Sequence, residues 1–387
     1  MTENKLTTVI PAYNADFDKL ARLLHTIATQ TPCDVIIVSD GDKKKDEYRT
    51  IAGSIFDNRF RVNVINCTEN LGPGGARQKG LDMVKTPYVN FCDADDLLAS
   101  PLIYENAIRV LDNDKSIVCA SYCFLQPNDE MTQFLPHMND MIWTFGKFYR
   151  VDFLKKYDVR FPMYDGRYLR ANEDTSFDQC IQLLANERER VVFFKNAAYI
   201  WMPKEDSITR VKYKDDLNQY NHDQCFCGWL LSTTLATQHA RTFRPFSGQI
   251  LQSIATTMIQ AFFYYQKCLH EAPFFAPQQW YYIKKFYHEQ YSELADKISD
   301  EALAEIYSVI SAQNGQNMIH IIPSFGIREY FDKLKESTFN PDEIYDIWAD
   351  MYKEDPEALE RNVKCGVMPK NYWRKSTNVT IAKKKKK

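Results

Sequence analysis

The first ninety residues alternate short apolar runs with segments of helical periodicity, and this alternation restricts the possible folds strongly. Residues 6–10 and 35–38 are apolar runs too short for helices, and residues 17–27 between them carry apolar side chains at helical spacing. Helical spacing returns over residues 76–84, and residues 88–92 read as a further strand. This alternation predicts an α/β fold, a Rossmann-like and mainly parallel sheet with helices on both faces. Ligands of such sheets bind beyond the carboxyl ends of the strands.

The length of 387 residues predicts two domains. Residues 1–214 contain the strand and helix alternation, and the signal becomes mainly helical over residues 215–387, which end in the basic tail Lys383–Lys387. Apolar residues make up 45% of the chain and charged residues 26%, a balance typical of globular proteins.

The sequence indicates a cytoplasmic protein. Its ten cysteines are scattered without a Cys-x-x-Cys pair, which favours reduced thiols over disulfides or zinc. The first residues lack a secretory leader, and we expect no transmembrane segment, because the best apolar stretch, residues 250–265, is interrupted by polar side chains. The net charge of −3 excludes a general attraction to polyanions, with the lysine tail as a local exception.

Acidic residues Asp93, Asp95 and Asp96 directly follow the apolar strand at residues 88–92. Three carboxylates within four residues repel one another unless a cation or hydrogen-bond donors neutralise them. Oxygen ligands at a strand end suit Mn²⁺ or Mg²⁺, which bind through one or two carboxylates and share their remaining ligands with phosphates and water. The alternative is a solvated acidic turn before the helix expected near Pro101.

Glycines 72, 74 and 75 precede a predicted helix. Arg77 stands where a dinucleotide-binding fingerprint needs its third glycine, so that fingerprint fails. A glycine-rich turn leading into a helix that carries Arg77 and Lys79 still predicts a phosphate contact.

These fragments together resemble the family 2 glycosyltransferases, which have the GT-A fold. The matching fragments occur in the family's order at residues 9–14, 38–42, 70–77, 91–96, 143–150, 172–174 and 207–209. The resemblance therefore implies a metal-dependent, inverting transferase that uses a nucleotide sugar, most often a UDP-sugar.

The resemblance also implies roles for individual residues. The residues expected at the donor are Pro11, Ala12, Tyr13, Asn14, Asp40, Arg77, Asp93, Ala94 and Trp143. Among them, Asp40 reads the uracil or other base, Arg77 approaches the base and phosphates, and Trp143 lies near the donor sugar. Asp95, together with Asp93, binds Mn²⁺ or Mg²⁺ on the diphosphate.

Glu173 and Asp174 match the family's catalytic acid pair, in which the second acid is the base. A single base without a protein nucleophile gives direct displacement and inversion. The alternative for this pair is the first-turn acids of a helix. The chain departs from the family at Ser39, where Asp-Asp-Gly-Ser has its first acid, and at residues 199–203, which lack a metal-binding histidine.

Two classes of acceptor are consistent with the sequence. A growing surface glycan is the first interpretation, with the tail Lys383–Lys387 touching anionic lipid head groups of a membrane-peripheral enzyme. The second is hydroxymethylated bases in DNA, as for some phage-encoded transferases, with the tail and Lys43–Lys45 on phosphates. Rivals of other classes are a nucleotidyltransferase, whose glycine-rich signature is missing from residues 11–14, and a degenerate glycan-binding module.

Overall fold

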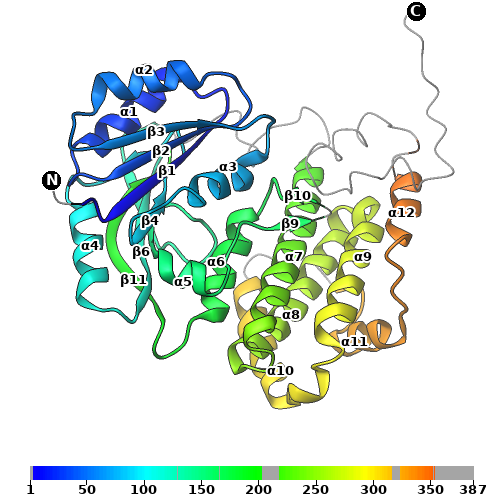
Figure 1. Ribbon diagram of the computed structural model, residues 1–387. Coiled ribbons are helices and arrows are strands. Elements are labelled where there is room, and N and C mark those ends of the chain that lie inside the picture. The colour runs from blue at the N-terminus through cyan, green and yellow to red at the C-terminus, as the bar shows by residue number, and fades with distance from the viewer. Residues whose placement is uncertain are drawn as a thin grey trace, which may run out of the picture. The chain divides into compact units, whose positions relative to one another are not determined.

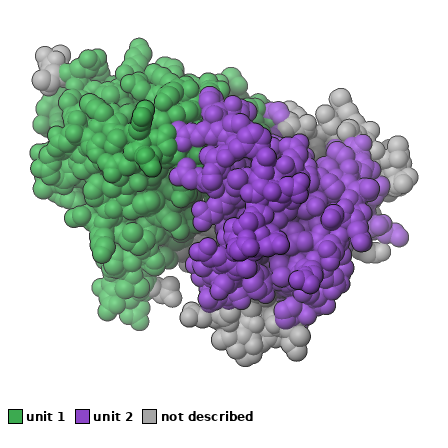
Figure 2. All heavy atoms as spheres, turned by 90° about the horizontal axis from the view of Figure 1, so that it is seen from below, with its two compact units in different colours: residues 1–163, 167–211 green, residues 164–166, 212–387 purple. Residues whose placement is uncertain are grey.

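The computed structural model describes residues 3–128, 130–164, 166–202, 218–315, 323–351 and 353. The chain divides into two compact units, residues 1–163 with 167–211 and residues 164–166 with 212–387 (Figure 2). The predicted boundary at residue 214 lies outside the described residues.

The first unit is built on a curled, mostly parallel sheet (Figure 1). The strands of this unit are β1 Leu6–Ala12, β2 Asp34–Ser39, β3 Arg61–Asn66, β4 Tyr88–Phe91, β5 Leu97–Leu98, β6 Ile117–Pro127, β7 Phe134–His137, β8 Lys147–Arg150, β10 Arg167–Tyr168 and β11 Arg190–Ile200, and β9 is Met163–Tyr164. The sheet order is β3-β2-β1-β4-β8-β6-β11-β5, with β7 beside β6. Strands β1 to β4 are parallel, and β8 is antiparallel to β4 and β6. The predicted α/β class is confirmed.

Helices cover both faces of this sheet, as the alternation of strands and helices predicts. The helices of the first unit are α1 Phe17–Ala28, α2 Lys45–Ile55, α3 Gly72–Leu81, α4 Ile103–Asn113, α5 Val151–Lys156 and α6 Glu173–Leu184. Leu6 and Ile10 of β1 pack in one core with residues of α1, α2 and α4. On the opposite face, Phe91 of β4 packs its ring against Phe177 of α6, and α3 lies on β1 and β2.

The glycine-rich segment belongs to helix α3 itself, so the predicted turn before the helix is wrong. Gly72 has a φ of +80° and is the first helical residue. A Cβ on Gly80 would collide with Val9 of β1, and a Cβ on Gly74 would lie 2.7 Å from Cγ of Glu173. The glycines therefore allow α3 to pack closely on the sheet and on α6.

The second unit is helical over its described residues, as predicted. Its main helices are α7 Asn218–Phe243, α8 Gly248–Glu271, α9 Ala276–Phe286, α10 Asp300–Gly315, α11 Ile327–Glu336 and α12 Glu343–Met351. Short 3₁₀ turns cover Pro273–Phe275 and Ala295–Lys297, and a π-helical turn covers Tyr287–Tyr291. Helices α7, α8 and α9 pack against one another, and α12 packs on α9.

Two general expectations can be compared with the described residues. Eight cysteines in this part of the chain are buried and free of disulfides, as predicted. None of the helices over these residues is both long and apolar enough to cross a membrane.

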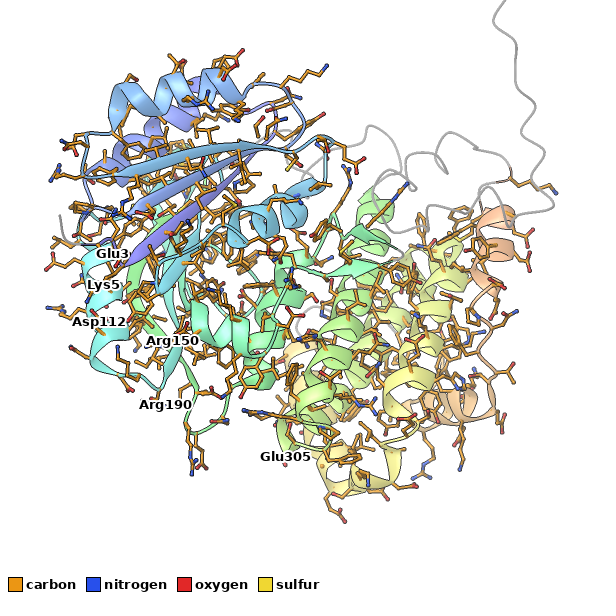
Figure 3. The ribbon with its side chains drawn as sticks, in the orientation of Figure 1. Glu3, Lys5, Asp112, Arg150, Arg190 and Glu305 are labelled. Atoms are coloured by element: carbon orange, nitrogen blue, oxygen red, sulfur yellow. The ribbon has the colours of Figure 1, made fainter. Side chains whose placement is uncertain are left out.

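Exposed ion pairs lie at the amino ends of the strands. Lys5 pairs with Asp112 at 2.6 Å, and Arg190 pairs with Asp114 at 2.6 Å (Figure 3). All four side chains are at least 30% exposed, which limits each pair to about 1 kcal/mol or less. The predicted site residues lie at the carboxyl ends of the strands.

Candidate active site

The predicted site residues follow the carboxyl ends of neighbouring strands. The backbone N–H of Asp40, after β2, donates to the carbonyl of Ala12 at the end of β1. The N–H of Cys92, after β4, donates to the carbonyl of Val9. Because these strands are in register, Asn14, Asp40 and Asp93 lie at one edge of the sheet, as predicted.

Arg77 joins the two acidic motifs that the sequence separates by about eighty residues. Its guanidinium donates to Oδ1 of Asp93 and to Oε1 of Glu173, each at 2.7 Å. The side chain is buried in helix α3, and Glu173 is buried at the start of α6. Arg77 and Glu173 thus form a buried ion pair, to which the partly exposed Asp93 is added, and breaking a buried pair by removing one partner costs about 3–5 kcal/mol.

Asp174 adjoins this triad and has a strongly altered acidity. It lies in the first turn of α6, is partly exposed, and its Oδ1 accepts the N–H of Thr175. Desolvation, reinforced by the Glu173 carboxylate and opposed by Arg77, raises the pKa of Asp174 to about 8. Desolvation also raises the pKa of Glu173, although Arg77 opposes it. The two adjacent acids therefore differ in their contacts, because Arg77 donates to Glu173 and the N–H of Thr175 donates to Asp174.

Asp40 is occupied by the backbone of the glycine-rich segment. Its two oxygens accept the N–H groups of Leu71 at 2.8 Å and Gly72 at 2.9 Å, and the side chain is 2% exposed. Burial raises the pKa of Asp40 despite these hydrogen bonds. Asp40 therefore caps α3 in the position where the sequence predicts a phosphate.

The loop after β1 is held by a residue that the sequence analysis did not select. Tyr13 is exposed, while Asn14 has a φ of +47° and donates its N–H to Asp42 at 2.7 Å. Ser39 and Tyr48 donate their hydroxyls to the same carboxylate, each at 2.5 Å. Burial alone would raise the pKa of Asp42, but these hydrogen bonds hold it below its ordinary value.

The acidic motif after β4 divides into a buried and a more exposed part. Asp96 is 2% exposed and accepts the Tyr199 hydroxyl and the N–H of Met202, each at 2.7 Å. The N–H of Asp93 donates to the same Tyr199 oxygen. Asp93, Ala94 and Asp95 are only partly buried. Asp96 thus fixes the turn. The carboxylates of Asp93 and Asp95 stay partly exposed at the carboxyl end of β4.

Trp143 lies at the end of a column of aromatic rings. Its ring stacks on Phe145 with centroids 5.9 Å apart, and Phe145 stacks on Tyr199 at 4.8 Å. Since Tyr199 contacts the backbone of Asp93, the column connects Trp143 to the acidic motif. The proximity of Trp143 to a donor sugar stays a prediction.

Lys79 does not join these residues. It is exposed, while Arg77 is buried two residues before it on the same helix. Side chains two residues apart on an α-helix point about 200° apart around the helix axis.

Within the part of the chain that the structure describes, no three His, Cys, Asp or Glu side chains form a group that could hold a metal ion.

The comparisons with known proteins agree with this geometry. The model of Glycosyl transferase family 2 matches residues 7–174, a range that contains Asp40, Arg77, Asp93 and the Glu173–Asp174 pair. The chain carries a family 2 glycosyltransferase domain. The match extends from β1 to the first turn of α6, so it includes both ends of the Arg77 bridge.

Relatives of this glycosyltransferase domain occur among bacterial proteins. The uncharacterized glycosyltransferase EpsJ of Bacillus subtilis is 26% identical over 234 residues, which are 57% of this chain and 67% of EpsJ. Succinoglycan biosynthesis protein ExoW of Rhizobium meliloti is 38% identical over 96 residues, 24% of this chain and 30% of ExoW. The structure of S. aureus TarS 1–349 in complex with UDP-GlcNAc is 17% identical, with a TM-score of 0.46, covering 74% of this chain and 93% of that one.

Three residues of the first unit with clear structural roles were not predicted from the sequence. Asp42, Lys147 and Asp178 are each hydrogen-bonded to site segments. Asp42 and Lys147 lie inside matching fragments, but no role was assigned to either of them, and Asp178 lies outside these fragments. The only available signal was a lysine, Lys147, inside the otherwise apolar and aromatic run at residues 143–149. A charge in such a run indicates a buried partner.

Proposed function

We propose that this protein transfers a sugar from a nucleotide sugar to an acceptor hydroxyl with inversion at the anomeric carbon. The observation that carries the proposal is the Arg77 bridge, which brings Asp93 and the Glu173–Asp174 pair to the same end of the sheet. A donor-binding acid and a base on opposite sides of one sugar are what single displacement requires.

In the proposed reaction, Asp174 accepts the proton of the acceptor hydroxyl. The hydroxyl oxygen forms a bond to the anomeric carbon while the bond to the diphosphate oxygen breaks, and the diphosphate leaves with the electron pair. Glu173 stays bound to Arg77 and orients the first turn of α6. Because one displacement inverts the anomeric carbon, the product has the configuration opposite to that of the donor.

The residues after β4 fit a divalent cation. Asp95, with Asp93 beside it, supplies carboxylate oxygens at a partly exposed strand end, and one or two carboxylates suffice for Mn²⁺ or Mg²⁺. Bound there, the cation would stabilise the charge that develops on the diphosphate. Arg77 supplies a fixed positive charge next to Asp93.

The proposed donor is a UDP-sugar, read at its base by Asp40. This carboxylate already accepts two backbone N–H groups, and a carboxylate has lone pairs for further donors. The remaining proposed donor contacts are Pro11, Ala12, Tyr13, Asn14, Ala94 and Trp143.

The proposed acceptor is a growing glycan, in line with the name of the relative ExoW, a succinoglycan biosynthesis protein. The DNA alternative depends mainly on Lys383–Lys387, which lie outside the described residues. The alternative also uses Lys43–Lys45, of which Lys43 is exposed and the other two are partly buried, and these three lysines alone do not favour DNA over a glycan.

The test measures nucleoside diphosphate release from a panel of sugar nucleotides with Mn²⁺, with and without EDTA. We expect UDP-sugars to be turned over and EDTA to abolish turnover. Asp174→Asn keeps the shape of the side chain and removes the proton acceptor, so turnover falls by about 10²-fold or more while UDP binding persists.

Asp112→Asn is the matched control, because it changes an acid at the opposite edge of the same sheet. Its turnover stays at the wild-type level. A near-normal rate for Asp174→Asn, or a product with the anomeric configuration of the donor, would overturn the assignment.

A further inference from the structure

A fully buried lysine lies beneath the proposed reaction centre. Lys147 is 0% exposed, and its ammonium pairs with Oδ2 of Asp178 at 3.2 Å. The same ammonium donates to Oδ1 of Asn139 at 2.7 Å and to the carbonyl of Trp143. Burial of an ammonium is costly and persists only when its hydrogen bonds and its charge are satisfied.

The contacts of Lys147 belong to two different segments of the site. Asn139 and Trp143 lie in the loop before β8, and the amide of Asn139 also donates to the carbonyl of Phe145 at 2.6 Å. Asp178 lies on α6, four residues and therefore about one turn after Asp174. Lys147 thus connects the loop that carries Trp143 with the helix that carries the proposed base.

Two further contacts tie these segments together. The hydroxyl of Thr175, next to Asp174, donates to the carbonyl of Ile142 at 3.4 Å. The Tyr149 hydroxyl donates to Oδ1 of Asp178 at 2.7 Å, so both oxygens of this acid face β8. The loop and α6 are therefore joined at the start of the helix and again one turn later.

We propose that Lys147 is a positioning residue that fixes the Trp143 loop against α6, so that the donor sugar and Asp174 meet in reactive geometry. This inference rests on the proposed function of Asp174. The competing explanation gives Lys147 only the task of neutralising Asp178. The two explanations predict different values of kcat when both charges are removed together.

The decisive variant is Lys147→Met combined with Asp178→Asn, which removes both charges and leaves an acceptor for the Tyr149 hydroxyl. If Lys147 positions the loop, kcat falls by about tenfold or more, because small displacements of reacting groups are costly. The Kd for UDP stays within about twofold, since the proposed base-reading residue Asp40 lies in a different segment. Wild-type kcat in this folded variant would overturn the inference.

A second variant keeps both charges. Asn139→Ala deletes the bonds from Asn139 to Lys147 and to Phe145 but leaves the ion pair intact. We expect a lower kcat with unchanged UDP affinity here too. If its kcat equals that of the wild type, the loop does not need this network, and the inference fails even if the double variant does not fold.

The matched control is Lys284→Met with Glu343→Gln, which removes a pair of 2.5 Å between a buried lysine and a partly exposed acid in the helical unit. Its stability falls, and its kcat does not. A wild-type protein that turns over no sugar nucleotide would instead refute the proposed function. An active wild type with unaffected Lys147 and Asn139 variants refutes only the positioning role.

Discussion

Asp174 lies in an environment that opposes its charge. Its carboxylate is desolvated and follows Glu173, and Arg77, the nearest cation, already donates to two other acids. A base of this kind is reactive because the folded protein stabilises its ionised form poorly. The same property reduces the stability of the folded state.

Asp174→Asn should therefore stabilise the protein increasingly as the pH rises. The pKa is about 8 in the folded state and about 3.9 in an unfolded chain. Between these values unfolding releases a proton, so the wild type loses stability as pH increases, and asparagine avoids this loss. We expect the Tm of the variant to exceed that of the wild type by roughly 2 °C or more at pH 8, and by little at pH 4.

Calorimetry at a series of pH values measures this difference. Asp112→Asn serves as the control, because hydrogen bonds lower the pKa of Asp112 and its loss has no such stabilising effect. A Tm difference for Asp174→Asn that is independent of pH would contradict the assignment of the raised pKa.

For individual residues, the sequence predicted the site where these residues form short motifs. Asp40, Arg77, Asp93 and Asp174 were selected from short ordered fragments, and the structure brings Arg77 to Asp93 and next to Asp174. Lys147 was not selected, because its importance depends on complete burial and on partners eight and thirty-one residues away. Such contacts depend on tertiary packing, which one sequence does not display.

Among the elements, helix α3 connects most of the site. Asp40 caps its first residue, its glycines allow close packing on Val9 and Glu173, and Arg77 lies one turn further on. The capping carboxylate and the base-reading carboxylate are proposed to be the same group. Loss of Asp40 should therefore affect both the helix and the nucleotide.

Asp40→Ala should lower the free energy of unfolding by about 1–2 kcal/mol, the usual cost of losing an N-terminal cap. It should also remove most of the thermal shift that UDP produces. Ser247→Ala deletes the cap of α8 in the helical unit and should lower stability without changing that shift. An unchanged preference for UDP over ADP and GDP in Asp40→Ala would contradict base reading by Asp40.

The larger elements were predictable, and the small ones were not. Strands β1 and β2 have clear apolar patterns. The apolar stripe of the last described helix, Ile344, Ile347, Trp348 and Met351, follows helical spacing in α12, where Ile347 is partly buried and the other three are buried. Strands β5 and β7 have two and four residues, too few for a pattern of period two. Helix α6 begins at Glu173, so its first turn is made of polar site residues and carries no apolar pattern.

For the whole molecule, the charge is unevenly distributed along the chain. The net charge is −3, yet the sequence ends in five lysines, Lys383–Lys387. A short cationic tail binds polyanions by releasing their counterions, and this binding depends steeply on salt. DNA, the alternative acceptor, would bind this tail through its phosphates.

Truncation after Ala382 should leave sugar-nucleotide hydrolysis unchanged. If the tail contacts DNA phosphates, the slope of log affinity against log salt for a 20-base-pair duplex should become shallower by up to about 4, since each contact contributes about 0.9. Fluorescence anisotropy of labelled duplex measures this slope for both chains. Equal slopes would remove the tail from any argument for a DNA acceptor.

The hydrogen bond between Ser39 and Asp42 has a consequence for the history of the chain. The related motif has its acid first and its serine last, and this chain has the two exchanged while still pairing a hydroxyl with a carboxylate. One substitution at a time, the exchange passes through either an acid or a serine at both position 39 and position 42. Two carboxylates there would repel each other, whereas two hydroxyls can still bond. A serine at both positions should therefore repel less than an acid at both positions.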